Sequence, residues 1–365
     1  MRILHIADVH LDRPFVGMAI EDARARRREL RSTFERCLNL AAEHHVELVT
    51  LGGDLWEDEH VTPDTLRWVS ARLGALRIPV VAVAGNHDPL SPGGPYDRAS
   101  FPQQVTVLPS DQGLVEYRSG DISVWGSSWR RGVPLNAAFL TDFTVPSDGR
   151  CHVLLLHGTC GMYFDGSPHC PFTAADVRHA GFDLCLAGHI HGGSVQNSLV
   201  VYPGSPEPLN WKETGRHAVA LVTVETGTPD VELVDVATRR YVELDIDCDG
   251  ADSSAEVQAL VHAALGEGRD MAGVCLRLRL GGRVLPGCDT GREALRTEIL
   301  DRGAAMVEVN DDTLVDFNLD EIAAGTGVSS YFVKGMRQLQ AERPADPVVD
   351  RALRLGLRAL HGEEL

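Results

Sequence analysis

Five short polar clusters, each placed directly after an apolar run, constrain the fold of this chain more than any other feature of its sequence. In chain order they are Asp8-Val9-His10, Gly53-Asp54, Gly85-Asn86-His87-Asp88, His157-Gly158 and Gly188-His189-Ile190-His191. The runs before them are 2–7, 46–51, 80–84, 152–156 and 182–187. Their length and their apolar content are typical of buried strands. Strands that end at one edge of a sheet would bring all five clusters together, so the pattern predicts one shared polar site.

The donor types in these clusters favour a pair of divalent metal ions. Carboxylates, an amide oxygen and imidazoles are hard or borderline ligands, which suit manganese, iron, zinc or magnesium better than soft metals. Two ions about 3.5–4 Å apart need a bridging carboxylate, and they clamp a phosphate while lowering the pKa of a bound water. Asp54, preceded by two glycines, is the candidate bridge. The clusters therefore predict phosphoester hydrolysis.

Residue spacing suggests roles inside the clusters. Asp8 and His10 lie two residues apart, so they would share a face of a strict strand, or converge through a turn just after it. Asn86 offers an amide oxygen to a metal. The adjacent His87 would then stay uncoordinated and face the leaving oxygen as general acid or charge stabiliser. Asp88 is expected to orient the His87 ring.

Each cluster taken alone has an ordinary structural interpretation. Asp-x-His and Gly-Asn-His-Asp are usually turns of solvated polar residues, and Gly-Asp after a strand is a common strand-to-helix turn. His157 could be a hydrogen-bonded core histidine, and His189 and His191 could be loop residues. All five clusters in sequence, each at a strand end, favour the metal site.

With these motifs the chain resembles the calcineurin-like metallophosphoesterases, and among them most the SbcD-type DNA repair exonucleases. The resemblance extends from residue 1 to about residue 225 and includes the stretches 5–12, 79–89, 171–191 and 202–207. It implies an α/β fold, a sandwich of two mixed sheets flanked by helices, with a smaller α+β capping domain.

The same resemblance implies a ligand set and an activity. One metal would be held by Asp8, His10, Asp54 and His191, and the other by Asp54, Asn86, His157 and His189. His87 would be the catalytic histidine. The implied reaction is phosphodiester hydrolysis in DNA, usually with Mn²⁺, beside a large SMC-like ATPase partner. Homodimerisation is plausible by the same resemblance.

The charge of the chain departs from that of an isolated DNA binder. There are 34 Lys plus Arg against 52 Asp plus Glu, a formal charge of −18, whereas DNA binders normally show a basic footprint. Metals and a partner would have to supply the contacts to the phosphates. Two basic clusters are interpreted as solvated helix or strand faces: Arg24, Arg26, Arg27, Arg28 and Arg31, and Arg277, Arg279 and Arg283.

An acidic stretch stands close to the candidate bridge. Glu57 lies three residues after Asp54, where the resembling enzymes commonly carry Asp or His, and is followed by Asp58, Glu59 and His60. Support for the metal ligands and a solvated loop are both open, and the solvated loop is favoured.

Patterning predicts three parts: an α/β domain over 1–236, an α+β domain over 237–342 and a C-terminal amphipathic helix over 343–365. The resemblance implies that the first is the metallophosphoesterase (nuclease) domain and that the second caps it. A helix is expected from about Ala25 to His45, and Ser253 with Glu256 predicts a capping box for a helix that ends at Leu265. In the tail, Asp346 is the expected N-cap and Pro347 the first helical residue. Its apolar stripe is Val349, Leu353, Leu357 and Leu360. It either packs on its own domain or docks on a partner.

Composition predicts a soluble cytoplasmic protein. No signal-peptide pattern or membrane-spanning apolar stretch is seen, and the eight cysteines have no Cys-x-x-Cys spacing, so they are interpreted as reduced thiols. Cys160, His169 and Cys170 are close enough to suggest zinc, but a loop is favoured there.

Two rival functions remain open. A small-molecule or cyclic-nucleotide phosphodiesterase, or a phosphatase, would use the same two metals, since the site specifies the ester and not the rest of the substrate. A scaffold that has lost its chemistry is disfavoured because every expected ligand and His87 are present.

Overall fold

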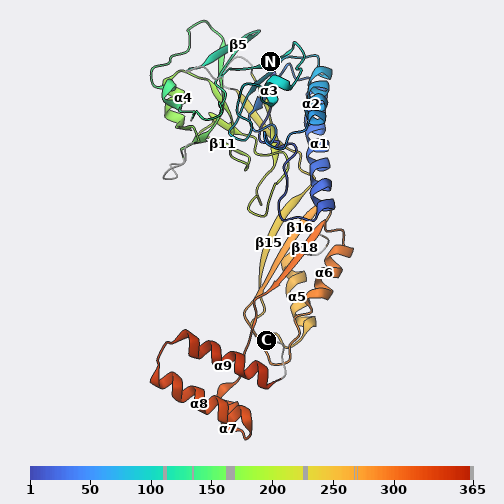
Figure 1. The fold of residues 1–365 in the computed structure, drawn as a ribbon, viewed down its shortest axis with the longest axis vertical. Helices are drawn as coiled ribbons and strands as arrows, with labels where there is room; N and C mark the ends of the chain where they lie inside the picture. Colours follow the sequence, from blue (N-terminus) through green and yellow to red (C-terminus); the bar gives the residue numbers. More distant parts are fainter. Residues whose placement is uncertain are drawn as a thin grey trace. The chain divides into compact units, whose positions relative to one another are not determined.

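The computed structural model describes residues 1–109, 113–133, 135–161, 169–224, 229–266, 268 and 270–361 (Figure 1). The chain divides into two compact units, Met1–Arg240 and Tyr241–Leu365, and each is described by itself. No helix in the described ranges combines the length and the apolarity that a bilayer crossing requires.

The first sheet of unit 1 has the strand order β14-β13-β1-β2-β3-β4. Its strands are β1 (Arg2–Ile6), β2 (Leu48–Gly52), β3 (Val80–Val83), β4 (Val105–Val107), β13 (Ala218–Thr223) and β14 (Asp230–Asp235). Strands β1 to β4 are parallel, whereas β13 and β14 are antiparallel additions at one edge. The four parallel strands therefore point their carboxyl ends at the same edge.

The second sheet of unit 1 has the order β11-β12-β10-β7-β6-β5. Its strands are β5 (Val115–Ser119), β6 (Ile122–Gly126), β7 (Cys151–His157), β10 (Leu184–Gly188), β11 (Ser194–Gln196) and β12 (Val200–Tyr202). The four inner strands are parallel and the two outer ones are antiparallel. A short pair, β8 (Thr159–Cys160) with β9 (Pro171–Phe172), follows β7.

The two sheets pack face to face through one buried apolar cluster. Leu48 and Val81 from the first sheet share it with Val153 and Leu155 from the second. Helices α1 (Ile20–Glu43) and α2 (Pro63–Ala75) lie side by side over the first sheet (Figure 1). The short helix α3 (Pro95–Arg98) follows β3 and contributes to the same apolar cluster. Helix α4 (Ala174–His179) and the 3₁₀ turn η1 (Ala137–Leu140) share a second apolar cluster with the other sheet. The predicted sandwich of two mixed sheets flanked by helices is confirmed.

Helix α1 begins at Ile20, about five residues before the expected start at Ala25. Apolar spacing misplaced the start because the first turn is polar and carries Glu21 and Asp22. Acidic side chains are favourable there, next to the positive end of the helix dipole.

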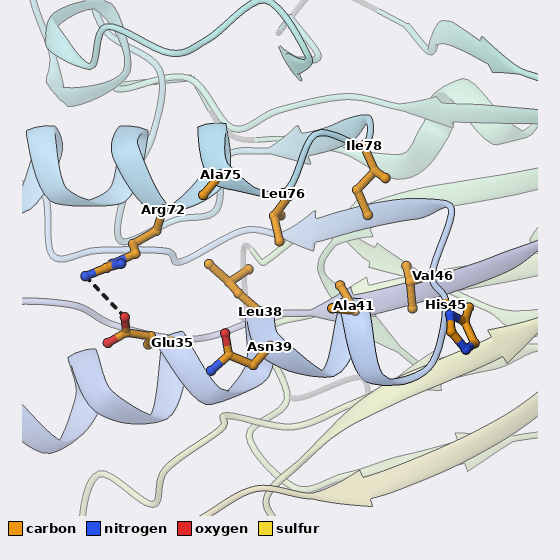
Figure 2. A pocket seen from close by; sticks show the side chains of 11 residues that line it. Glu35, Leu38, Asn39, Ala41, His45, Val46, Arg72, Ala75, Leu76 and Ile78 are labelled. Atoms are coloured by element: carbon orange, nitrogen blue, oxygen red, sulfur yellow. Dashed lines mark ion pairs between the residues drawn. The ribbon is translucent and has the colours of Figure 1, made fainter.

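A groove runs between the C-terminal halves of α1 and α2 (Figure 2). Leu38 and Ile78 form part of its apolar floor, and the Glu35–Arg72 ion pair, 3.2 Å long, crosses one end. None of the predicted site residues lines this groove.

Unit 2 contains a three-stranded sheet in the order β15-β16-β18, from β15 (Arg240–Asp247), β16 (Val274–Gly281) and β18 (Met306–Asp311). Helices α5 (Ser254–Leu265) and α6 (Arg292–Asp301) share its apolar cluster, and β17 (Arg283–Val284) pairs with β19 (Leu314–Val315). The predicted capping box is wrong. Ser253 makes no capping hydrogen bond, and the Glu256 carboxylate instead accepts the Asp252 N–H at 3.0 Å.

The C-terminal part of unit 2 is helical, with α7 (Leu319–Ala324), α8 (Val328–Glu342) and α9 (Pro347–Leu360). As expected, Asp346 caps α9 by accepting the Val348 N–H at 2.9 Å, and Pro347 is its first residue. Leu353 and Leu357 pack with Val333 of α8 in one buried cluster. The apolar stripe thus packs inside its own unit. Leu360, the last residue of the predicted stripe, is the exception, because it is 41% exposed.

Candidate metal centre

The five polar clusters meet at the carboxyl ends of β1, β2, β3, β7 and β10. Among the described residues, three overlapping groups of donor atoms form there, and within each group all atoms lie within 4.8 Å of one another. The groups are Asp8, His10 and His191; Asp8, Asp54 and His157; and His10, Glu57 and His87. Because the two sheets face each other, clusters that are up to 181 residues apart become neighbours.

Distances between side chains show that Asp54 lies between two sets of imidazoles. Its Oδ2 is 3.7 Å from His10 Nε2 and 3.3 Å from His157 Nε2. On one side, His10 Nε2 faces His191 Nε2 at 3.2 Å. On the other, Asn86 Oδ1 lies 2.9 Å from His157 Nε2 and 3.1 Å from His189 Nδ1. All seven predicted metal ligands are therefore brought together, with Asp54 in the middle.

Four of these residues have backbone conformations that are unusual for L-amino acids. Asp8, His10, Asp54 and His189 have φ values of 54°, 49°, 51° and 99°. Such conformations cost on the order of 1–3 kcal/mol each and persist only where the surroundings enforce them. Here the backbone does so: Asp8 N–H donates to Gly53 O at 3.1 Å and His10 N–H to Asp54 O at 2.9 Å. Asp8 and His10 thus converge through a turn, the second of the two predicted geometries.

Three of the imidazoles are held through Nδ1, the ring nitrogen that faces away from the other donors. His157 Nδ1 faces Gly52 O at 2.8 Å, His10 Nδ1 faces Glu57 Oε1 at 3.0 Å and His191 Nδ1 faces Glu213 Oε1 at 3.1 Å. A proton donated to these oxygens leaves the Nε2 lone pair directed into the site, which is the arrangement of metal-binding histidines. This observation shows that the residues present fit divalent cations.

The electrostatics of the site also favour positive charge. Burial alone would lower the pKa of His157, but the Asp54 carboxylate outweighs burial and raises that pKa to about 9. Burial would likewise raise the pKa of Asp54, yet the charge and hydrogen bond of His157 hold it well below its usual range. Two buried carboxylates, Asp8 and Asp54, thus create a position that a cation can occupy.

Glu57 belongs to this site, so its interpretation as part of a solvated loop is wrong. Its side chain is only 13% exposed, and besides His10 it contacts His87 Nδ1 through Oε2 at 3.0 Å. Arg13 donates to Oε1 at 2.9 Å. Burial would raise the pKa of Glu57, but the hydrogen bonds and charges of His10 and His87 hold that pKa well below its usual range.

Asp88 does not orient the His87 ring, which corrects the sequence-based expectation. Its carboxylate accepts the N–H groups of Gly85, Asp54 and Leu55 at 2.6, 3.0 and 2.7 Å, and the Tyr96 hydroxyl at 2.8 Å. Burial, followed by the charge of Asp54, raises the pKa of Asp88 to about 6. Asp88 therefore braces the loops that carry the donors.

His87 is the most accessible of the predicted functional residues, with 43% of its side chain exposed. Its ring centroid lies 4.9 Å from that of His10, and its backbone N–H donates to Asp54 Oδ1 at 2.8 Å. The Glu57 hydrogen bond raises the pKa of His87. A protonated imidazole that solvent and substrate can reach is suited to proton donation.

Two oxygens behind the imidazoles were missed from the sequence. Gly52 O belongs to the backbone and has no residue signature. Glu213 lies 22 residues after His191, in the loop that follows β12, so no short motif connects them. Sequence offers no signal for either contact, because both arise from how the loops pack.

The Cys160, His169 and Cys170 group does not form a metal site among the described residues, and residues 162–168 between them lie outside that part of the chain. Cys160 and Cys170 are buried, while the His169 ring lies 4.7 Å from the ring of His189. The loop interpretation thus fits the described residues better than zinc.

The two basic clusters are largely neutralised. In α1, Arg26 is buried against Pro208 O and Glu29, which contradicts a fully solvated face, and Arg31 pairs with Asp64. In unit 2, each of the clustered arginines contacts a carboxylate: Arg277 and Arg279 pair with Glu243, and Arg283 with Asp316. Neither cluster amounts to a basic footprint.

Two mixed sheets that carry carboxylate, amide and imidazole donors at their facing strand ends define the metallophosphoesterase class. A family model described as "Calcineurin-like phosphoesterase superfamily domain" matches residues 1–227, a span that includes every residue of the five clusters. The chain belongs to this superfamily, and its site is that of a metal-binding hydrolase.

Three curated relatives extend this comparison. "Uncharacterized metallophosphoesterase YhaO" of Bacillus subtilis (strain 168) is 28% identical over 299 residues, 77% of this chain and 72% of that protein. "DNA double-strand break repair protein Mre11" of Sulfolobus acidocaldarius is 24% identical over 276 residues, 70% of this chain and 69% of that protein. The protein of the same name from Methanopyrus kandleri is 26% identical over 238 residues, 58% of this chain and 50% of that protein.

Proposed function

We propose that this protein is a metal-dependent phosphodiesterase that cleaves DNA. The observation that carries the proposal is the position of Asp54 Oδ2, 3.7 Å from His10 Nε2 and 3.3 Å from His157 Nε2, between two sets of inward-directed donors. One cation would be held by Asp8, His10, Asp54 and His191. The other would be held by Asp54, Asn86, His157 and His189, and Mn²⁺ is the proposed ion in both positions. Bound there, the cations supply charge neutralisation at the phosphodiester and an acidified water.

The chain's own residues then have distinct tasks. His87, exposed beside the donors, protonates the leaving oxygen, and general acid catalysis of this kind contributes about 10²–10⁴-fold. Glu57 holds the His87 ring through Nδ1, which leaves Nε2 for the substrate. Asp88 keeps Asp54 in place through the backbone. Asp8, His10 and His189, like Asp54, present their donor atoms from residues with a left-handed φ.

DNA is the proposed substrate because two of the relatives carry the name of a DNA double-strand break repair protein. The formal charge of −18 and the neutralised arginine clusters argue that most contacts to the DNA backbone come from elsewhere. An SMC-like ATPase partner is proposed as their source. A homodimer and a cytoplasmic location remain part of the same proposal.

The test is digestion of end-labelled linear double-stranded DNA with Mn²⁺, alone and with a cognate SMC-like ATPase, beside a bis-phosphodiester dye. We expect wild type and His179→Ala, an exposed histidine on α4, to cut DNA and His87→Ala to lose that activity while still binding Mn²⁺. An active His87→Ala variant would contradict the assignment of the proton donor. Cleavage of the dye but of no DNA under either condition would remove DNA as the substrate.

A second candidate is hydrolysis of a small phosphodiester or phosphomonoester, as in cyclic-nucleotide phosphodiesterases and phosphatases. The formal charge of −18 favours it, since a small substrate needs no extended basic footprint. The dye arm of the same experiment separates the two candidates.

A further inference from the structure

One loop of unit 1 contacts both a predicted metal ligand and the end of the unit. The loop spans residues 203–213 after β12. Its Ser205 N–H donates to His191 O at 3.0 Å. Its Glu207 carboxylate accepts hydrogen bonds from the boundary segment, residues 236–239, which precedes β15 at the end of unit 1. We propose that Glu207 is a positioning residue: it anchors the loop, and the loop holds His191 where cation binding requires it. This inference rests on the proposed function for the role of His191.

Glu207 is buried, and donors from two other segments surround its carboxylate. Oε1 accepts the Thr33 hydroxyl of α1 at 2.6 Å and the Thr238 N–H at 2.6 Å, and it also accepts the Thr238 hydroxyl. Oε2 accepts the Arg239 N–H at 3.2 Å. The Arg36 guanidinium of α1 lies 3.7 Å from Oε1. One carboxylate thus joins the loop, α1 and the boundary segment, and none of the three can shift without leaving buried polar groups unpaired.

The boundary segment is also tied to α1 by hydrogen bonds of its own. The Arg239 guanidinium donates to both carboxylate oxygens of Glu29, at 2.8 Å from Nε and 2.6 Å from a terminal nitrogen. Only 20% and 27% of these two side chains are exposed. Arg36 donates to Val236 O at 2.7 Å. Because bidentate arginine–carboxylate contacts are strong and directional, they hold the boundary segment where it supplies donors to Glu207.

The loop holds His191 through both its backbone and its ring. Besides the Ser205 contact to the carbonyl, Glu213 Oε1 lies 3.1 Å from His191 Nδ1. Gly204 brings the loop close, since a Cβ there would lie 2.6 Å from His191 O. A shift of the loop therefore displaces the imidazole, and loss of such supporting contacts typically weakens a metal site about 10- to 100-fold. Only one of the two proposed cation positions includes His191, so only one binding step should weaken.

The test measures amide hydrogen exchange by mass spectrometry in the full chain without cation or DNA, followed by calorimetric titration with Mn²⁺. Arg239→Ala loosens the boundary segment and leaves every residue of the loop unchanged. We expect exchange at Ser205 to become about tenfold faster, because the loop loses part of its anchor. One of the two Mn²⁺ binding steps should then weaken about tenfold, and the other should not change. Glu207→Gln should weaken the same step about 10- to 100-fold.

Arg72→Ala is the matched control, since it removes a different arginine–glutamate pair that α1 makes, the contact with Glu35 at 3.2 Å. Its exchange at Ser205 and both of its Mn²⁺ steps should be those of wild type. Wild-type exchange at Ser205 in Arg239→Ala, or faster exchange with two unchanged Mn²⁺ steps, would overturn the proposal. A wild-type chain that binds no Mn²⁺ or cuts no DNA would contradict the proposed function, while exchange at Ser205 still decides on the anchor. If Glu207→Gln does not fold, Arg239→Ala decides.

Discussion

The carboxylate of Asp88 holds the backbone of Asp54: Asp88 Oδ1 accepts the Asp54 N–H at 3.0 Å. The other oxygen accepts the next N–H, that of Leu55, at 2.7 Å. Asp54 stands in the middle of the donor set and has a left-handed φ of 51°. The acidic residue of one motif thus supports the conformation of the acidic residue of another.

Replacement of Asp88 by Asn tests this brace. The asparagine amide keeps one oxygen as an acceptor. Its NH₂ group replaces the other oxygen and would face N–H donors at a fully buried position. We expect the free energy of unfolding to fall by about 2–4 kcal/mol, measured by chemical denaturation. Tyr96→Phe, which removes one hydrogen bond to the same carboxylate, should cost about 1 kcal/mol. A change below about 0.5 kcal/mol in Asp88→Asn would show that the brace is dispensable.

Gly85→Ala should disturb the centre by steric means alone. A Cβ at this position would overlap Asp54 Oδ1 and lie 2.7 Å from Asp54 N, so the candidate bridge must shift. We expect Mn²⁺ affinity, measured by calorimetric titration, to fall at least about tenfold. Gly74→Ala, near the end of α2, is the control. A Cβ there would lie 3.4 Å from Pro102, an ordinary contact, so the variant should raise the free energy of unfolding by about 0.5–1 kcal/mol and leave Mn²⁺ affinity unchanged. Unchanged Mn²⁺ binding in Gly85→Ala would contradict the placement of Asp54.

Asp54→Asn should abolish paired cation binding. The variant keeps the shape of the side chain but loses the charge that faces His10 and His157. Calorimetry with Mn²⁺ is expected to show about 100-fold weaker binding, and hydrolysis should be lost with it. Asp97→Asn, an exposed aspartate on α3, should bind Mn²⁺ as wild type does. Two wild-type binding steps in Asp54→Asn would rule out the bridging role.

His5 should make stability depend on pH below neutrality. Burial lowers the pKa of His5 to about 4, with Nδ1 facing the Thr50 hydroxyl at 3.0 Å and Nε2 facing Ala187 O at 3.3 Å. The unfolded chain, with a pKa near 6.5, binds the proton first as pH falls, so this contribution is complete above about pH 6.5. It is lost as pH falls to about 4, and the loss amounts to about 3 kcal/mol.

Denaturation of wild type and His5→Gln from pH 7.5 to 4 measures this effect. The difference in unfolding free energy between the two should shrink or change sign as the pH falls, because only wild type carries the His5 titration. Parallel pH profiles of the two proteins would refute the assignment to His5.

Sequence by itself determined the strands, the donor types and their order. Asp8, Asp54 and His157 each follow an apolar run at a strand end, and that pattern is local, since alternation and turn chemistry act over a few residues. Parallel strands that share an edge then require such ends to meet. For the same reason the N-cap of α9 at Asp346 was readable from three residues, although Ser253 shows that a capping pattern alone does not guarantee the hydrogen bonds.

Only the tertiary structure decided which side chains support the donors. Glu57, from the loop after β2, contacts the His87 ring, a role that the motif suggested for Asp88. The Asp88 carboxylate instead accepts buried N–H groups. Glu213 reached His191 from a loop with no sequence signature. Likewise, α9 could have packed inside or outside its unit, and contact with α8 selected the first. These choices depend on which buried polar groups lack partners after packing, and no local pattern encodes that.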